Sequence, residues 1–463
     1  MMMLKKTSAF VLMLCMAASM AMAHPAKKRD KKALEELLHN TCKVYDLMRT
    51  EKGFYRDYVG TKDVCDHGST ASIGMGLVSL CIANQMGWAP DAEQKIIQTL
   101  NSVLGDENQQ GIARTPKGCY IHFFDLETGA AKGDDYSPID TNIMLGGALF
   151  AKRYFHKNET IARLADQLYN EVDESLFVGD VKTGKICLKM NEDGSPLNMY
   201  TSPYNEYMMV AYFAKSQESV LDGKAHQNWN GHYGNPSKLP AVDYVTKSGE
   251  KIPVNTDLAF MNEFTSNFTF MFNYLFVHSF SNDPVYIQKL KNAAMADRAW
   301  WQEHPQRAEK GWKDYEWGTT AGTGLYNRNG KIGQGYMVDK ICLAENIGTN
   351  KDHNRGLNVA PSALAGYSPA MPQEVETDLL AMLHDQRKIG QMTLPKQEGI
   401  TTGKEFVLWK YSYADPSWKA DRIEGVDFGC MLMGLAALPD LLGHEFFNTY
   451  NDFFNPDAPQ YHK

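Results

Sequence analysis

The stretch SPIDTNIMLGGALFAKRYF, residues 137–155, decides the fold class of this chain. Pro138 stands where a proline is expected at the start of a helix. The residues that follow, 143–155, are apolar on more than one side of a helix. A helix of this kind is buried inside a larger assembly. Residues 428–438 repeat the pattern, so at least two helices are predicted to be central.

Apolar residues at helical spacing continue through most of the chain, and no Pro/Gly/Ser linker divides it. Further helices are predicted at residues 31–49, 69–87, 91–104, 159–173, 203–216, 262–280, 284–303, 335–347, 372–388 and 440–454. With those at 139–156 and 425–438 they predict an all-α (α/α)6 toroid, an inner ring of helices within an outer ring. An irregular helical domain is the alternative.

Short segments typical of strands interrupt the helices. Cys119–Phe124 is one, and Lys185–Met190 is a second that has turn residues at both ends. We expect such segments to form β-hairpin loops at one mouth of the toroid, where functional sites concentrate.

The N-terminus has the pattern of a cleavable secretory signal. Lys5 and Lys6 precede an apolar stretch, and Ala21-Met22-Ala23 fits a cleavage site after residue 23. We therefore expect a mature chain of one domain, residues 24–463, in the periplasm or outside the cell. No segment reaches the roughly 18 uninterrupted apolar residues of a membrane span.

The composition excludes several classes of function. The formal net charge is −8, which argues against nucleic acid as a partner. Cys42, Cys65, Cys81, Cys119, Cys187, Cys342 and Cys430 remain after signal removal, and no two have the spacing of a zinc or redox motif. We expect most of them to be buried, and the sequence leaves open whether one or two disulfide bridges form. We expect the protein to act as a monomer without metal or cofactor. No zincin, phosphate-loop or serine-hydrolase motif is present.

Three carboxylates beside apolar or aromatic residues are the best candidates for chemistry. Asp140, Glu206 and Asp427 each stand near the predicted start of a helix. Acidic residues also favour first helical turns through the helix dipole, so capping explains any one of them. Three at equivalent helix ends would converge on one cavity of a toroid, which capping does not require.

Convergent carboxylates are what glycosidic cleavage needs. One acid must hold its proton at the working pH, and an apolar pocket raises its pKa accordingly. The second carboxylate activates water or stabilises the sugar cation. Glu206, among tyrosines and methionines, is predicted to be the general acid, with Asp427 or Asp140 as the base.

The same stretches resemble the glucoamylase-like family of bacterial secreted proteins, related to endo-β-1,2-glucanases and to a domain of cyclic β-1,2-glucan synthases. The similar segments are Tyr120–Phe123, Tyr136–Thr141, Tyr204–Met208, Trp317–Ala321, Asn358–Leu364 and Val426–Gly429. The resemblance implies an (α/α)6 toroid that hydrolyses glucan chains with anomeric inversion. It maps the proton donor to Glu206 and the two aspartates to Asp140 and Asp427. The sugar-binding residues we expect are Tyr204, Trp317, His122, Tyr136 and Tyr315.

The chain departs from the family pattern at three places. Gly322-Thr323-Gly324 stands where the family has Ser-Asp-Gly, Leu435–Leu438 where it has Glu-Asn, and Tyr200 where a Trp is common. Such departures are compatible with a changed linkage or with a lost activity, and the sequence does not decide between them. Two other hypotheses stay open: a polysaccharide lyase or unsaturated uronyl hydrolase on a similar toroid, and a non-catalytic glycan-binding protein.

Overall fold

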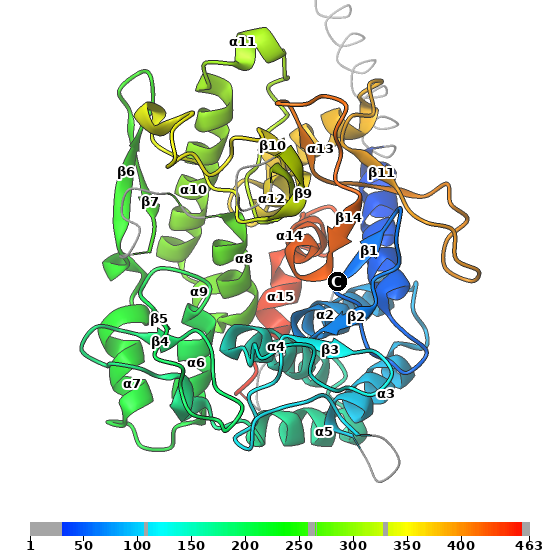
Figure 1. The fold of residues 1–463 in the computed structure, drawn as a ribbon, viewed down its shortest axis with the longest axis vertical. Coiled ribbons are helices and arrows are strands. Elements are labelled where there is room, and N and C mark those ends of the chain that lie inside the picture. Colours follow the sequence, from blue (N-terminus) through cyan, green and yellow to red (C-terminus); the bar gives the residue numbers. More distant parts are fainter. Residues whose placement is uncertain (1–29, 106–109, 258–263, 265, 327–331, 456–463) are drawn as a thin grey trace, which may run out of the picture.

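The computed structural model describes residues 30–105, 110–257, 264, 266–326 and 332–455 (Figure 1). The predicted signal peptide, residues 1–23, lies outside this range. The helices are residues 30–48, α2 (Thr70–Gln85), α3 (Ala92–Leu104), α4 (Pro138–Tyr154), α5 (Glu159–Asn170), α6 (Met208–Gln217), α7 (Lys224–Asn228), α8 (Asn267–Phe276), α9 (His278–Ser281), α10 (Pro284–Glu303), α11 (Arg307–Lys310), α12 (Pro361–Gly366), α13 (Pro372–His384), α14 (Gly425–Ala436) and α15 (His444–Tyr450).

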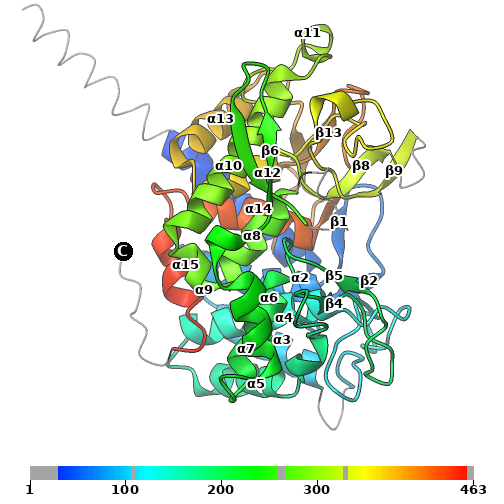
Figure 2. The same cartoon turned by 90° about the vertical axis from the view of Figure 1, so that its left-hand side faces the viewer.

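The strands are short and pair two by two, always antiparallel. The pairs are β1 (Tyr58–Gly60) with β14 (Arg422–Glu424), β2 (His67–Ser69) with β3 (Phe123–Asp125), β4 (Ile186–Cys187) with β5 (Tyr200–Thr201), β6 (Ala241–Val245) with β7 (Lys251–Asn255), β8 (Gly322–Tyr326) with β9 (Ile332–Met337), β10 (Asn358–Val359) with β13 (Tyr411–Ser412), and β11 (Gln391–Thr393) with β12 (Phe406–Leu408). Figure 2 shows β1, β2, β4, β5, β8 and β9 together on one side of the helices, with α15 on the other side.

The central helices contact one another in a closed series. Helix α2 packs on α4, α4 on α6, α6 on α8, α8 on α12, α12 on α14, and α14 on α2 again. Helices α3, α5, α10 and α13 lie outside this series in Figure 1. The molecule is therefore helix-rich, with one group of helices enclosed by others.

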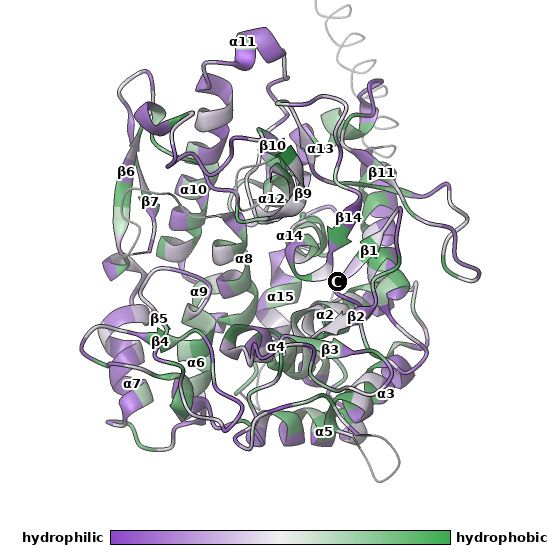
Figure 3. Cartoon of the chain, in the orientation of Figure 1, coloured by the Kyte–Doolittle hydropathy of each residue, from purple (hydrophilic) through white to green (hydrophobic). Residues whose placement is uncertain are grey.

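The central helices are buried because their sequences are apolar all round. Every residue of α2 from Thr70 to Ala83 is buried, and so is nearly all of α14. Outer helices are mixed; α5, for example, buries only one face (Figure 3). The prediction that residues 143–155 and 428–438 form central helices is confirmed.

Helices α2 and α4 approach one another through glycine. A Cβ added to Gly147 would lie 2.2 Å from the carbonyl oxygen of Gly74, and one added to Gly74 would lie 2.2 Å from that of Ile143. No side chain fits at such distances, so the two backbones touch here. The close contact places the start of α4, and with it Asp140, beside α2.

Several predicted elements differ in the structure. The helix predicted at residues 335–347 is wrong: Gly335–Met337 belong to β9, and only Ala344–Asn346 form one 3-10 turn. Pairing with β8 overrides the helical spacing there, and Gly335 lowers the helix propensity of the segment. Part of the helix predicted at 262–280 falls on residues outside the described range, and the rest is divided into α8 and α9. Helix α12 was not predicted.

The remaining predictions about elements hold in part. The predicted strands at Cys119–Phe124 and Lys185–Met190 shorten to β3 and β4. All seven described cysteines are buried, as expected, and none of them forms a disulfide with another. Among the described residues, no helix combines the length and the apolar character that crossing a bilayer requires.

The contact between α2 and α4 makes a prediction about stability. We expect Gly147→Ala to lower the free energy of unfolding by at least about 1–3 kcal/mol, the usual cost of overpacking. Thermal or denaturant unfolding measures it. Gly231→Ala is the control, because this exposed helical glycine has nothing within 4 Å of an added Cβ. Equal stabilities of the two variants would contradict the contact.

Candidate active site

Asp140 and Asp427 occupy equivalent positions on two central helices. Each is the third residue of its helix, Asp140 in α4 and Asp427 in α14, and each is nearly inaccessible, with 7% and 2% of its surface exposed. Neither carboxylate caps its helix. Asp140 interacts with His122 and with Ser137, the N-cap residue of α4, and Asp427 accepts a hydrogen bond from the hydroxyl of Tyr336. Capping therefore does not explain Asp427, whereas Asp140 also contacts the cap of its helix.

Glu206 lies in the turn that leads into α6, not in its first turn as predicted, because α6 begins only at Met208. Hydrogen bonds of Asn205 hold this turn. Its amide nitrogen donates to Asp257 at 2.7 Å, its side-chain oxygen accepts from the Tyr207 backbone at 3.0 Å, and its carbonyl accepts from Asn273 at 2.9 Å. The position of Glu206 is thus fixed from three sides.

Glu206 lines a cavity of about 360 Å³. Tyr204, Tyr207, Asp257 and Lys340 are among its other lining residues. Burial, together with the charges of Asp257 and Asp140, raises the pKa of Glu206 to about 7, although Lys340 lowers it. Glu206 therefore carries its proton for much of the time at neutral pH, as a general acid must.

Asp140 faces a histidine. Its Oδ2 lies 3.7 Å from Nδ1 of His122, and Asp135 Oδ2 lies 3.4 Å from the same nitrogen. Burial lowers the pKa of His122, but the two carboxylates outweigh it and bring the pKa to about 9. His122 is therefore a cation at neutral pH. Burial raises the pKa of Asp140, against the opposing charge of His122.

Two further acids, Glu424 and Asp57, act on Asp427, and neither was predicted from the sequence. Burial raises the pKa of Asp427 well above the ordinary value, Glu424 and Asp57 raise it further, and Lys410 opposes them. Glu424 is the residue before α14, and burial raises its pKa to about 6. Its place three residues before Asp427 could have suggested it, whereas nothing local marks Asp57.

The charges of these acids link the three predicted catalytic residues. Asp140 raises the pKa of Glu206, and Asp57 raises that of both Asp140 and Asp427. Asp140 therefore lies within electrostatic reach of Glu206, and Asp57 lies within electrostatic reach of both Asp140 and Asp427. Asp140 and Asp427 do not themselves line the cavity of Glu206.

The predicted sugar-binding residues are dispersed. Tyr204 backs the cavity of Glu206, but its ring is buried and its hydroxyl lies 3.1 Å from that of Tyr286. Tyr136 is also buried, whereas His122 is half-exposed beside Asp140. Trp317 is fully buried: it donates to Asp378 at 2.8 Å and stacks on Tyr367, so it has no free face for a sugar.

Tyr315 belongs to a different cluster. Its hydroxyl donates to Asp385 at 3.0 Å and accepts from Arg387 at 3.4 Å. The hydroxyl of Tyr315 is therefore bonded to other side chains of the protein and does not mark a sugar-binding position. Among the described residues, no group of three or more His, Cys, Asp and Glu side chains has an arrangement that could hold a metal ion.

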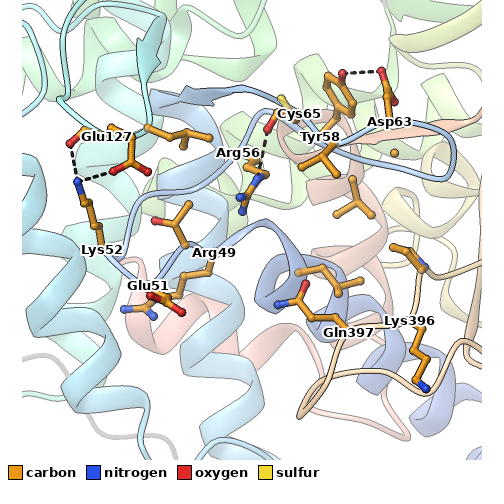
Figure 4. A pocket seen from close by; sticks show the side chains of 17 residues that line it. Arg49, Glu51, Lys52, Arg56, Tyr58, Asp63, Cys65, Glu127, Lys396 and Gln397 are labelled. Carbon is orange, nitrogen blue, oxygen red and sulfur yellow. Dashed lines mark hydrogen bonds and ion pairs between the residues drawn. The ribbon is translucent and has the colours of Figure 1, made fainter.

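A larger cavity, about 600 Å³, opens between β1 and the loop at residues 395–397 (Figure 4). Its charged side chains are of both signs and partly neutralise one another. Lys52 pairs with Glu127 at 2.7 Å, and Arg56 donates to the carbonyl of Cys65 at 3.2 Å. None of the predicted catalytic acids is among its described lining residues. Size alone therefore does not locate the chemistry.

The fold matches known structures over almost its full length. An endo-β-1,2-glucanase from Chitinophaga pinensis, in complex with sophorotriose and glucose, has a TM-score of 0.69 and 17% identity, covering 90% of this chain and 94% of that one. A "putative glucoamylase" from Bacteroides uniformis has a TM-score of 0.69 and 15% identity, covering 91% and 96%. A β-1,2-glucanase from Parabacteroides distasonis has a TM-score of 0.64 and 17% identity, covering 90% and 58%.

These likenesses match, at the level of fold, the family resemblance drawn from the sequence motifs. No protein-family model and no curated protein sequence matches the chain. Identities of 15–17% establish a shared fold, and chemistry must be argued from the site.

The contact between His122 and Asp140 makes a second prediction. Because carboxylates stabilise the imidazolium, the imidazole of His122 is expected to titrate near pH 9 in NMR spectra of the whole chain, assigned by signal loss in His122→Gln. Asp140→Asn is expected to lower this value, whereas Asp243→Asn, at an exposed site, is the control and leaves it unchanged. A His122 titration at the ordinary value near 6.5 in the wild type would contradict the contact.

Proposed function

We propose that the mature chain is a secreted or periplasmic glycoside hydrolase that cleaves a glucan, with β-1,2-linked chains the favoured substrate. The observation that carries the proposal is Glu206, a carboxyl group with a pKa of about 7 that lines a cavity and lies within electrostatic reach of a second buried acid. The fold shared with two β-1,2-glucanases supports the choice of substrate.

The reaction requires Glu206 to be protonated and a second carboxylate to be ionised. Glu206 donates its proton to the glycosidic oxygen as the bond from that oxygen to the anomeric carbon breaks. Water attacks the anomeric carbon from the opposite face and gives its proton to a carboxylate. Glu206 is then ionised and the base protonated, and proton exchange with solvent restores both. We expect inversion at the anomeric carbon.

Asp427 suits the base better than Asp140. Asp140 faces the cationic His122, which stabilises the ionised form of Asp140 and so makes Asp140 a weaker base. The Oδ2 of Asp427 is buried and has no hydrogen-bond partner among the residues that the structure describes. When Asp427 is ionised, this oxygen can accept a proton from water, and the raised pKa of Asp427 makes it a stronger base than an ordinary aspartate. Asp140 then serves to keep Glu206 protonated through its charge.

We infer that the closed series of central helices is the inner ring of an (α/α)6 toroid. Its successive contacts and the outer placement of α3, α5, α10 and α13 support this arrangement. Inner helices of such a ring begin at the same mouth, where Asp140, Glu206 and Asp427 stand near helix starts. The strands gathered on one side of the helices would surround a bound saccharide there.

The first test is the loss of the proton donor. We expect Glu206→Gln to lower the release of reducing ends from linear β-1,2-glucan by about 10²–10⁴-fold, the usual contribution of a general acid. Circular dichroism and thermal unfolding should show an intact fold. Glu374→Gln, an exposed position on α13, is the matched control.

Product profiles on β-1,2-, β-1,3- and β-1,6-glucans, with starch as a further substrate, decide the linkage. Full activity of Glu206→Gln would remove this residue from the donor role. New ultraviolet absorbance from an unsaturated product would instead favour a lyase. Binding without turnover on all glycans would favour a glycan-binding protein.

The second test is the pH dependence of kcat/KM. Glu206 acts while protonated, so activity is expected below about pH 7 and to be lost as the pH rises through this value. Lys340→Met removes a charge that lowers the pKa of Glu206, so it should move the alkaline limb to higher pH. Lys351→Met, in an exposed loop, is the control. An alkaline limb that does not move would contradict the role of Lys340.

A further inference from the structure

The β8–β9 hairpin contacts both acids at the start of α14. Thr323 and Tyr336 are direct partners across the two strands. The hydroxyl of Thr323 donates to Oε1 of Glu424, and that of Tyr336 donates to Oδ1 of Asp427 at 3.2 Å. One cross-strand pair thus supplies one hydroxyl to each of two neighbouring carboxylates.

We propose that Thr323, Tyr336 and Glu424 are positioning residues for the base of the reaction, with the hairpin holding Glu424 and Asp427 as one unit. The inference rests on the proposed function, since it takes Asp427 as the base. It adds residues that neither the sequence motifs nor the comparisons assign.

The geometry of Glu424 argues against a purely local role. Glu424 precedes α14, where a side chain commonly caps the helix, yet it makes no such hydrogen bond. Its Oε1 accepts from Thr323 instead, and its Oε2 is buried without a partner among the described residues. The side chain is therefore turned from its own helix toward the hairpin.

Each carboxylate keeps one oxygen that the hairpin does not occupy. These are Oε2 of Glu424 and Oδ2 of Asp427, both buried and unpartnered within the described chain. A buried acceptor left without a donor costs free energy, so such atoms commonly mark a site for water or ligand. Two of them on adjacent acids suit a water molecule that must be oriented and then deprotonated.

The hairpin approaches Glu424 closely at Gly322. This residue has a φ of +123°, which side chains rarely adopt, so the backbone conformation here favours glycine. A Cβ added to it would lie 3.4 Å from Oε2 of Glu424, in van der Waals contact, so the strand passes directly beside the carboxylate. The Gly322-Thr323-Gly324 segment that departs from the family pattern is the segment that makes this contact.

Other charged and titratable groups surround Asp427. Asp57 and Glu424 disfavour its ionised form and Lys410 favours it. Lys410 is itself committed to Asp339 at 2.7 Å in a fully buried pair. Tyr45 and Cys430 also lie within electrostatic reach, and burial raises the pKa of both well above ordinary values, so they are neutral. Glu424 raises the pKa of Asp427 and Tyr336 lowers it, so removing one group or the other should shift this pKa in opposite directions.

The experiment measures the acid limb of the kcat/KM profile, which reports ionisation of the base. Tyr336→Phe removes a hydroxyl that favours ionised Asp427, so the limb should move to higher pH. Glu424→Gln removes a charge that disfavours it, so the limb should move to lower pH. Both variants should lower kcat more than they change KM, by about 10–100-fold, as expected for a lost hydrogen bond to a charged group.

Tyr326→Phe is the matched control, because this tyrosine lies on the same hairpin and its hydroxyl makes no hydrogen bond to any residue that the structure describes. It should leave the limb in place. A merely structural role would lower activity without moving the limb in opposite directions. Limbs that stay fixed, or move the same way, would overturn the proposal.

A second readout does not depend on catalysis. Burial raises the pKa of Glu424 to about 6, so the folded state binds its proton more tightly than the unfolded state between about pH 4.5 and 6. The stability that this group contributes is therefore lost as the pH rises through that window. Over the same pH range, the Tm of Glu424→Gln should fall less than the Tm of the wild type. Thr323→Val should change Tm less in the Glu424→Gln background than in the wild type.

These outcomes separate the two proposals. A wild type that cleaves no glucan refutes the proposed function, and the Tm cycle then still decides whether the hairpin holds Glu424. Additive effects in that cycle would overturn the coupling. Cleavage with unmoved limbs refutes the positioning role and leaves the proposed function standing.

Discussion

The withdrawal of carboxyl groups from water at the starts of central helices is the constraint on which this structure depends. Asp140, Asp427, Glu424 and Glu206 all have raised pKa values, and burial is the largest cause for each. The amino-terminal ends of helices offset part of this cost. The nearby cations offset another part but are shared, since His122 faces two aspartates and Lys410 pairs with Asp339. The site therefore holds more acid than it can neutralise.

An excess of buried acid is useful because it separates the protonation states of neighbouring groups. Charge on one carboxylate keeps a proton on the next, so a general acid and a general base can coexist at one pH. In this chain the separation is spatial as well. Asp140 stands with a cation, Glu206 lines a cavity, and Asp427 keeps an oxygen without a partner. The scaffold tolerates this arrangement because its apolar helices supply stability elsewhere.

The elements that could be predicted from the sequence are those whose structure is set by their own residues. Helices α4 and α14 are apolar all round and so had to be central, and Asp140 and Asp427 follow from their positions in them. Predictions were wrong where a partner far along the chain decides. Residues 335–337 are strand because they pair with β8, and Glu206 precedes α6 because Asn205 bonds to Asp257 and Asn273. Trp317 is a core residue because Asp378 and Tyr367 enclose it.

By itself, the sequence determined the helical class of the fold, the central helices and three acids near helix starts, because apolar periodicity and helix-end signals act over a few residues. Only the tertiary structure decided which groups surround those acids. Asp57 acts on Asp427 from the bend before β1, more than three hundred positions away in the sequence. Thr323 and Tyr336 reach the start of α14 because two strands pair in one register. Protonation depends on burial and on neighbouring charge, and both exist only once distant segments have packed together.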